Sequence, residues 1–173
     1  MLSGFLKKLL LSRQAMLDEG QITLLDTSFY LQPVSELVFL HYDMKTKFGD
    51  DGTKTLYEAG KKSSQDFFKK IEKLTVKKED RVRLFFNMLN LYGLGELRIV
   101  TIADGTKAVI ETGNNNFAKR YLQQYGRQEG AVDHLLAGLL AGFFEQLWKK
   151  PVHAEEVSCI AGAKMRCQFR IDG

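Results

Sequence analysis

The chain ends in a stretch, residues 151–173, that reads PVHAEEVSCIAGAKMRCQFRIDG, and this stretch decides how we interpret the fold. It holds both cysteines of the chain, Cys159 and Cys167. Residues 157–161 and 165–171 have the pattern of two short strands, and the three residues between them include a glycine, as is common in hairpin loops. A turn centred in this loop places the two cysteines opposite each other on one face of the hairpin. We therefore expect their sulfur atoms to lie side by side.

Three interpretations fit such a pair of thiols. Free cysteine is among the most buried residue types, so the pair is compatible with ordinary core packing. A cross-strand disulfide is the second interpretation, and it suits a secreted chain better than a cytosolic one. A metal site is the third, because two thiolates supply half of a tetrahedral zinc shell. The nearby side chains that could complete the shell are His153, Glu155, Glu156, Asp133 and His134.

Strand alternation favours some of these donors over others. In an unbroken strand His153 shares a face with Cys159, whereas Glu156 points to the opposite face. Glu156 reaches the sulfur atoms only if the strand begins late or carries a β-bulge. Alternation alone therefore favours His153 as a ligand.

The same stretch resembles a known family. Glu156 is followed by Cys159 and then by Cys167, and the chain continues as Cys-x-Phe-x-Ile. This arrangement is similar to the end of the 4-vinyl reductase domain, part of a wider superfamily of ligand-binding domains in nitric-oxide signalling and Golgi transport. The sensor domains of phenol- and xylene-responsive bacterial activators are similar here as well. The resemblance implies a ligand-binding α+β domain with a role in sensing and transcription regulation.

The resemblance also implies a set of metal ligands. In those sensor domains the corresponding glutamate and cysteines bind zinc together with a further cysteine upstream. Carried over, Glu156, Cys159 and Cys167 are zinc ligands. The upstream cysteine is absent, and an ungapped alignment places Asp133 there, with His134 beside it. We therefore expect a structural zinc site near the C-terminal hairpin, completed by one of these two residues.

Length and composition indicate one compact body in a reducing compartment. The chain has 173 residues, of which 45% are hydrophobic, and this is enough for a real core. Two cysteines exclude a disulfide-rich scaffold and favour a cytoplasmic location. The net charge of +4 is mild, and no nucleic-acid-binding motif is present, which argues against direct binding of nucleic acid. No apolar run approaches the roughly 18 residues that span a bilayer, and Lys7 and Lys8 interrupt the apolar N-terminal segment, which argues against a signal peptide.

Residues 2–17 are predicted to form an amphipathic helix. Leu2, Leu6 and similar residues recur at helical spacing on one side of it. Such a helix can join the core, dock on a second copy of the chain or lie on a membrane surface. We assign residues 1–18 to a helical arm that dimerises and residues 19–173 to a single ligand-binding domain.

The rest of the chain alternates hairpins with helices. Hairpins are predicted at 21–32, 96–112 (through Asp104-Gly105) and 157–171, and helices at 34–48, 53–74, 75–92, 115–125 and 131–148. This order indicates an α+β fold, in which helices pack over an antiparallel sheet built from hairpins, together with the N-terminal amphipathic helix. His41 is expected in the core or at an interface. Small residues such as Gly138 and Gly142 indicate close packing on the sheet or a neighbouring ligand pocket.

The pattern favours a binding protein over an enzyme. The chain has no Gly-rich phosphate loop, no serine elbow and no histidine–carboxylate pair at diagnostic spacing. We expect a sensor or regulatory domain that encloses an apolar or aromatic small molecule between its helices. The rings predicted to line this pocket are Phe67, Phe85, Phe86, Tyr121, Phe143, Phe144 and Trp148.

A protein-interaction module is the alternative function. The resemblance to Golgi-tethering subunits implies it, because those proteins work as subunits that bind one another. The expected partners under the two hypotheses are a second copy of the chain, a small apolar ligand and a regulatory protein.

Overall fold

The computed structural model describes residues 31–103 and 105–173, together with residues 4, 7, 11–12, 15–18, 21–25 and 27–29 of the N-terminal part. The chain divides into two compact units, residues 1–33 and 34–173. Helices and antiparallel sheets are both present, so the predicted α+β class is confirmed. Within the described residues, no helix combines the length and apolar character needed to cross a membrane.

The N-terminal unit contains a three-stranded antiparallel sheet in the order β1-β2-β3. The strands are β1 (Ala15–Asp18), β2 (Gln21–Leu24) and β3 (Thr27–Phe29), so the hairpin predicted at 21–32 is confirmed. The predicted N-terminal helix is present at the described residues Gly4, Lys7 and Leu11 but ends earlier than expected. Ala15 is buried and Met16 exposed, an alternation typical of a strand. The other residues of 2–14 lie outside the described ones.

The second unit contains four helices: α2 (Val34–Leu74), α3 (Lys78–Leu91), α4 (Asn116–Tyr125) and α5 (His134–Trp148). The helices predicted at 34–48 and 53–74 are the two arms of α2. At Gly49, where φ is 56° and ψ is −129°, the backbone leaves the helical region and α2 kinks. Glycine adopts such a conformation without the steric cost that a Cβ atom brings. The kink therefore explains why the sequence predicts two helices here.

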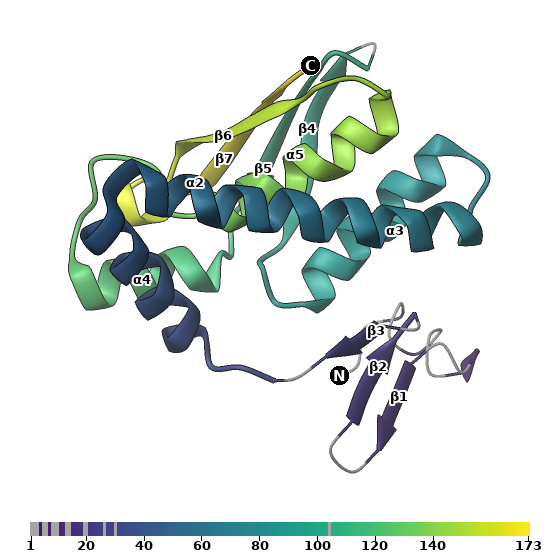
Figure 1. Ribbon diagram of the computed structural model, residues 1–173, viewed down its shortest axis with the longest axis horizontal. Coiled ribbons are helices and arrows are strands. Elements are labelled where there is room, and N and C mark those ends of the chain that lie inside the picture. Colours follow the sequence, from purple (N-terminus) through teal and green to yellow (C-terminus); the bar gives the residue numbers. More distant parts are fainter. Residues whose placement is uncertain are drawn as a thin grey trace. The chain divides into compact units, whose positions relative to one another are not determined.

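A four-stranded antiparallel sheet completes this unit, in the order β4-β5-β7-β6 (Figure 1). Its strands are β4 (Leu97–Ala103), β5 (Lys107–Thr112), β6 (His153–Ser158) and β7 (Cys167–Asp172). The predicted β4–β5 hairpin is confirmed, and the C-terminal strands β7 and β6 extend the sheet beside β5. Ala108 and Ile110 of β5 lie opposite Ile171 and Phe169 of β7, and all four are buried on one face.

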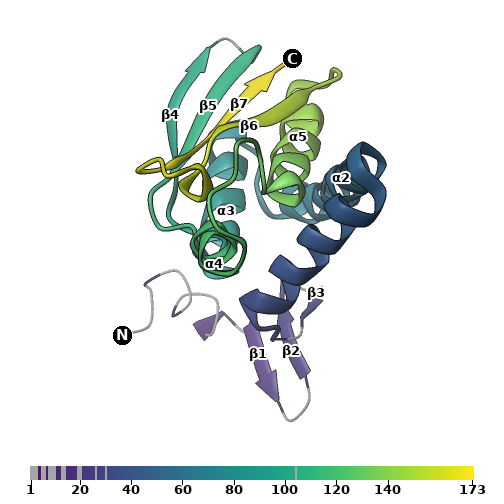
Figure 2. The same ribbon diagram turned by 90° about the vertical axis from the view of Figure 1, so that its left-hand side faces the viewer.

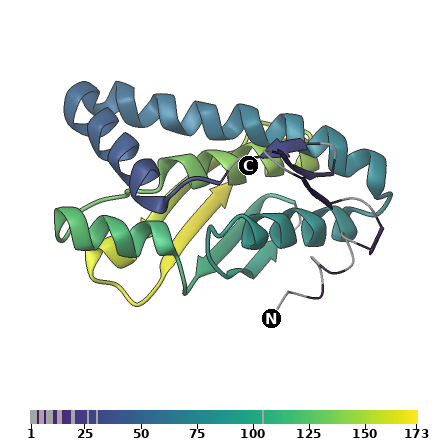
Figure 3. The ribbon, with the colours of Figure 1, turned by 90° about the horizontal axis from the view of Figure 1, so that it is seen from below.

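The helices cover that buried face. Figures 2 and 3 show α5 between the sheet and α2, so this part of the molecule has three layers. Contacts of α5 with β6, β7 and α2 agree with this order. The core between the layers is built largely from the apolar helix α5 and the inner face of the sheet.

The small residues of α5 permit close packing on α2. A Cβ atom added at Gly138 would lie 2.0 Å from the Tyr57 carbonyl oxygen, and one at Gly142 would lie 2.2 Å from that of Lys61. On α2, a Cβ at Gly60 would lie 2.2 Å from the Leu135 oxygen. The predicted close packing is therefore present, but its partner is a helix and not the sheet.

Candidate metal centre and adjoining cavity

Strand β6 ends in a β-bulge that turns Glu156 into the interior. Glu156 and Ser158 pair with consecutive residues of β7, so Val157 is the extra residue. The bulge reverses the alternation: Glu156 is buried, whereas Val157 is exposed. The condition for Glu156 to reach the cysteines is therefore met. His153, which simple alternation favoured, is exposed and lies near Tyr57.

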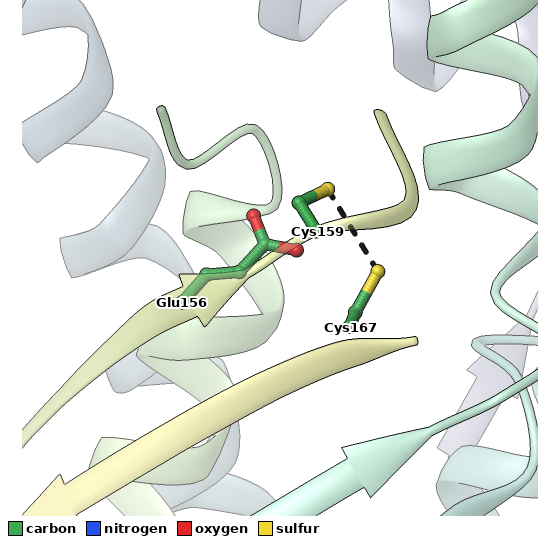
Figure 4. A group of neighbouring side chains, drawn as sticks. All are labelled: Glu156, Cys159 and Cys167. Carbon is green, nitrogen blue, oxygen red and sulfur yellow. Dashed lines mark hydrogen bonds between the residues drawn. The ribbon is translucent and has the colours of Figure 1, made fainter. Parts of the chain in front are cut away.

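The connection from β6 to β7 is longer than the predicted three-residue loop. It contains a short 3₁₀ helix, η1 (Ile160–Gly162), and Cys159 is the residue that caps it. The Cys159 sulfur accepts a hydrogen bond from the Ala161 N–H, and the Cys167 sulfur accepts one from the Ile160 N–H, each at 3.3 Å. The two Sγ atoms are 3.8 Å apart (Figure 4). The predicted adjacency of the sulfur atoms is therefore confirmed.

Glu156 joins the two cysteines in one buried cluster. One ligand atom from each of Glu156, Cys159 and Cys167 lies within 4.8 Å of the other two, the group of this kind found among the described residues. Glu156 Oε2 accepts hydrogen bonds from the N–H groups of Val132 (2.7 Å) and Asp133 (3.1 Å). Its Oε1 is buried and has no hydrogen-bond partner in the described part of the chain. Figure 4 shows the carboxylate directed toward the cysteines.

The geometry and chemistry of the cluster fit a zinc ion. A tetrahedral ion with Zn–S bonds of about 2.3 Å holds its two sulfur ligands about 3.8 Å apart, which matches the observed Sγ–Sγ distance. Thiolates and a carboxylate are zinc ligands, and the unpartnered Oε1 supplies the oxygen. Backbone N–H groups that donate to both sulfur atoms are the outer interactions that orient thiolate ligands.

The electrostatics of the cluster favour a cation. Hydrogen bonding to Cys167 and burial, with the charge of Glu156, raise the pKa of the Cys159 thiol far above its usual range. Burial and the neighbouring Asp133 raise the pKa of Glu156. A bound cation would stabilise the anions that the site otherwise disfavours, so metal binding would release protons.

Asp133 lies next to this cluster but is not one of its three members. Its Oδ1 accepts a hydrogen bond from the Leu136 N–H and caps α5, and its Oδ2 accepts one from Asn115. Burial raises its pKa to about 6. Its backbone N–H donates to Glu156, so the structure gives Asp133 a positioning contact with the cluster.

His134 also lies outside the group of three, although the sequence placed it among the candidate ligands. It begins α5, and burial and the nearby His41 lower its pKa to about 4. His41 is 2% exposed, its Nδ1 lies 3.1 Å from the Val132 carbonyl oxygen, and its ring contacts Phe117. The prediction that His41 is a core histidine is confirmed. Its proximity to His134 carries no signal in the sequence, because the two residues lie on different helices.

The rings predicted to line an apolar pocket pack against one another. Phe85 stacks on Phe143 with ring centroids 3.9 Å apart, and Phe144 contacts both Phe143 and Trp148. The remaining contacts of this set include Phe67–Phe85 and Phe85–Phe86, whereas Tyr121 packs with Tyr42, Phe117 and Tyr125. A ligand among these rings would therefore need them to separate.

An open cavity of about 550 Å³ adjoins the metal centre. Its walls are the α4–α5 loop, the end of β6 and the loop that follows. The lining residues are Arg127, Gln128, Glu129, Gly130, Ala131, Glu156, Val157, Ser158, Cys159, Gly162 and Lys164. A second cavity, of about 420 Å³, also borders Glu156 and is lined by Asp133, His134 and His153. The sequence shows the α4–α5 loop only as a polar segment, because nothing local indicates which element it faces.

Comparison with known families identifies the C-terminal part of the chain. Residues 115–172 match the 4-vinyl reductase domain family. This range includes α4, α5 and the strands β6 and β7, and therefore the whole Glu–Cys–Cys cluster. No curated protein matches the chain significantly.

Solved structures with the same fold cover most of the chain. The phenol-responsive sensory domain of the transcription activator PoxR, solved with phenol, has a TM-score of 0.83 at 15% identity, covering 99% of this chain and 91% of that one. A trafficking protein particle complex subunit 3 from Naegleria fowleri, covalently bound to palmitic acid, has a TM-score of 0.55 at 11% identity, covering 80% and 93%. A vinyl-4-reductase family protein from Methanocaldococcus jannaschii has a TM-score of 0.50 at 17% identity, covering 84% and 98%. At these identities the likeness shows the fold, and together with the family match over residues 115–172 it confirms that this chain carries a 4-vinyl reductase domain.

Proposed function

We propose that the protein is a small-molecule-binding sensory or regulatory domain whose C-terminal hairpin is held by a zinc ion. The ligands would be Glu156, Cys159 and Cys167. The observation that carries the proposal is the buried Glu–Cys–Cys cluster with its sulfur atoms 3.8 Å apart, inside the part of the chain that matches the 4-vinyl reductase domain. The similarity of the fold to the sensory domain of PoxR supports the sensory role.

The proposed role of zinc is structural. The ion would tie the loop after β6 to the first residue of β7, and through Glu156 to the backbone at the start of α5. The unfolded chain does not preform such a site, so binding and folding would be coupled.

Elemental analysis of protein purified without a chelator tests the metal. We expect zinc at close to one ion per chain, lost in Cys159→Ser and Cys167→Ser together with a lower melting temperature. Met165→Ser is the matched control, because Met165 lies in the same loop and is 93% exposed. A wild-type protein without zinc, or two cysteine variants that keep it, would show the proposal to be wrong.

The proposed ligand is an apolar or aromatic small molecule that enters the ring cluster of α3 and α5. Trp148 is the single tryptophan of the chain and contacts Phe144, so its fluorescence reports on this cluster. We expect phenol to change this fluorescence saturably and to raise the melting temperature. Phe143→Leu should weaken the response, whereas Phe48→Leu, at an exposed ring of α2, should not. A linear, non-saturating change in the wild-type protein would remove this ligand class.

A protein-interaction module is the second candidate function. The first arm of α2 exposes Phe39, Leu40 and Phe48 at 49%, 49% and 60%, and the trafficking complex subunit shares the fold. Large apolar side chains exposed together are typical of contact surfaces. We expect the chain to sediment as a dimer that Leu40→Glu and Phe48→Glu dissociate. A monomeric wild-type chain would exclude the homodimer.

A further inference from the structure

We propose that the zinc centre keeps one open coordination position facing the 550 Å³ cavity, and that this position takes a small polar molecule through a neutral nitrogen donor. The inference rests on the zinc site proposed above and names a ligand for it. This ligand site is separate from the aromatic cluster of α3 and α5, because none of those rings lines the cavity.

The first observation is that the described residues supply three protein ligands and zinc takes four. Asp133 stands where the ungapped alignment would place a further cysteine, but both of its carboxylate oxygens already accept hydrogen bonds, from Leu136 and from Asn115. His134 lies outside the group and lines the second cavity. Three protein ligands with one open position are the arrangement of zinc sites that exchange ligands.

The second observation is that the cavity reaches the centre. Glu156 and Cys159 line it, whereas Cys167 is fully buried behind them. Glu156 is 8% exposed, and its Oε1 has no partner within the described part of the chain. The volume of about 550 Å³ lies within the range of roughly 300–1,000 Å³ that small-molecule sites occupy.

The walls and the charges define the ligand. Most lining residues are polar, no aromatic ring is among them, and Val157 is the largest apolar one. Two thiolates and a carboxylate outweigh the charge of a zinc ion, so a further anionic donor would add to an existing negative charge. A neutral nitrogen donor avoids this cost and suits zinc. Arg127 and Lys164 in the walls can pair with a carboxylate elsewhere on the same ligand.

The test uses the full chain loaded with Co²⁺ in place of zinc, because the visible bands of Co²⁺ report its coordination. Imidazole is the probe and azide the anionic comparison. We expect thiolate-to-cobalt charge-transfer absorption, and d–d bands that shift saturably with imidazole and less readily with azide.

Filling the cavity provides the matched variants. Gly130 lines the cavity, and a Cβ atom added there would meet nothing within 4 Å. Gly130→Leu should therefore bind Co²⁺ like the wild type but lose the imidazole response. Gly113→Leu, at a second open position that does not line the cavity, should keep both.

The outcomes separate this inference from the proposed function. Absence of charge-transfer absorption means that the metal site itself is wrong. Charge-transfer absorption with d–d bands that imidazole leaves unchanged means that the centre is closed, and the inference fails while the zinc proposal stands. Extraction of the metal by imidazole, stronger binding of azide, or an unaltered response in Gly130→Leu would each overturn the inference as well.

Discussion

Glu156 is the side chain that connects the cysteine pair to the helices. One carboxylate oxygen accepts two backbone N–H groups before α5, and the other is buried and directed toward the sulfur atoms. The folded state raises the pKa of this carboxyl through burial and the charge of Asp133. Without a metal, ionised Glu156 therefore opposes folding at neutral pH.

This conflict predicts opposite effects of Glu156→Gln with and without zinc. The amide keeps an oxygen for the two N–H groups and removes the buried charge, so the metal-free variant should be as stable as the metal-free wild type or more stable. It supplies no anionic ligand, so the rise in melting temperature on adding zinc should be smaller. Thermal unfolding with zinc and with a chelator measures both quantities. A metal-free variant that is clearly less stable would mean that the carboxylate has a structural role of its own.

His41 predicts how the stability of the metal-free protein depends on pH. Burial lowers its pKa from 6.5 to about 4. The unfolded chain therefore takes up a proton between pH 6.5 and 4 that the folded chain refuses, so stability falls as pH falls through this window and does not change from this cause above it. The full effect is on the order of 3 kcal/mol, and His134, whose pKa is also lowered to about 4, acts in the same direction.

The variant His41→Asn isolates this effect. Its amide can donate to the Val132 oxygen that lies near Nδ1, but it does not titrate. We expect lower stability at every pH, because the ring contact with Phe117 is lost, and a shallower dependence on pH between 6.5 and 4. Urea denaturation at several pH values measures the slope. His153→Asn, at an exposed site, controls for the removal of an imidazole, and an unchanged slope in His41→Asn would contradict the assignment.

The sequence predicted the members of the cluster through two different kinds of signal. The adjacency of the cysteines follows from a glycine-containing turn between two strand patterns, and it survives the longer connection that the structure has. Strand periodicity favoured His153 over Glu156, and only the family resemblance kept Glu156. The bulge at Val157 reverses the faces, and no local residue pattern announces it. The capping role of Asp133 depends on Asn115 of another element and is equally invisible in the sequence.

At the scale of elements, the close contact between α2 and α5 depends on glycine. Gly138→Ala would place a Cβ atom 2.0 Å from the Tyr57 carbonyl oxygen and 3.0 Å from the Lys61 nitrogen. Both neighbours are backbone atoms, so the two helices must move apart. Overpacking of this kind costs about 1–3 kcal/mol, occasionally more, although alanine is the better helix former.

We therefore expect Gly138→Ala to lower the denaturation midpoint clearly. Gly113→Ala is the matched control, because a Cβ there meets nothing within 4 Å, and its stability should be unchanged or slightly higher. Chemical denaturation of both variants measures the difference. Equal midpoints would mean that the helices are not held as closely as the structure has them.

Most elements of the second unit were predictable, because their periodicity is local. The helix predicted at 115–125 is α4 (Asn116–Tyr125), and Asn115 caps it by accepting from the Ala118 N–H. The order of strands was not predictable in the same way. The placement of β7 between β5 and β6 depends on pairings between residues far apart in the chain, such as Ile110 with Phe169. Such pairings leave no pattern in either strand alone.

At the scale of the whole molecule, the chain contains two compact units, and the main core lies within one of them. The buried apolar cluster draws its members from Val38 to Ile171, so residues 34–173 hold the four-stranded sheet, its helices and the Glu–Cys–Cys cluster. A body with its own core and its own hydrogen-bonded sheet has what independent folding requires. The arm predicted at residues 1–18 contributes to the other unit, and its role in dimerisation stays a prediction.

Deletion of residues 1–33 tests both statements in one molecule. We expect residues 34–173 to unfold cooperatively and to keep the zinc content of the full chain, because every proposed ligand and nearly all of the core remain. If the arm dimerises the protein, the full chain should sediment as a dimer and the shortened chain as a monomer. Near-ultraviolet circular dichroism, thermal unfolding and sedimentation velocity measure the three properties. A shortened chain that keeps zinc but remains dimeric would move the interface to α2, where Leu40→Glu then becomes the deciding variant, whereas a loss of cooperative unfolding would mean that the second unit depends on the first.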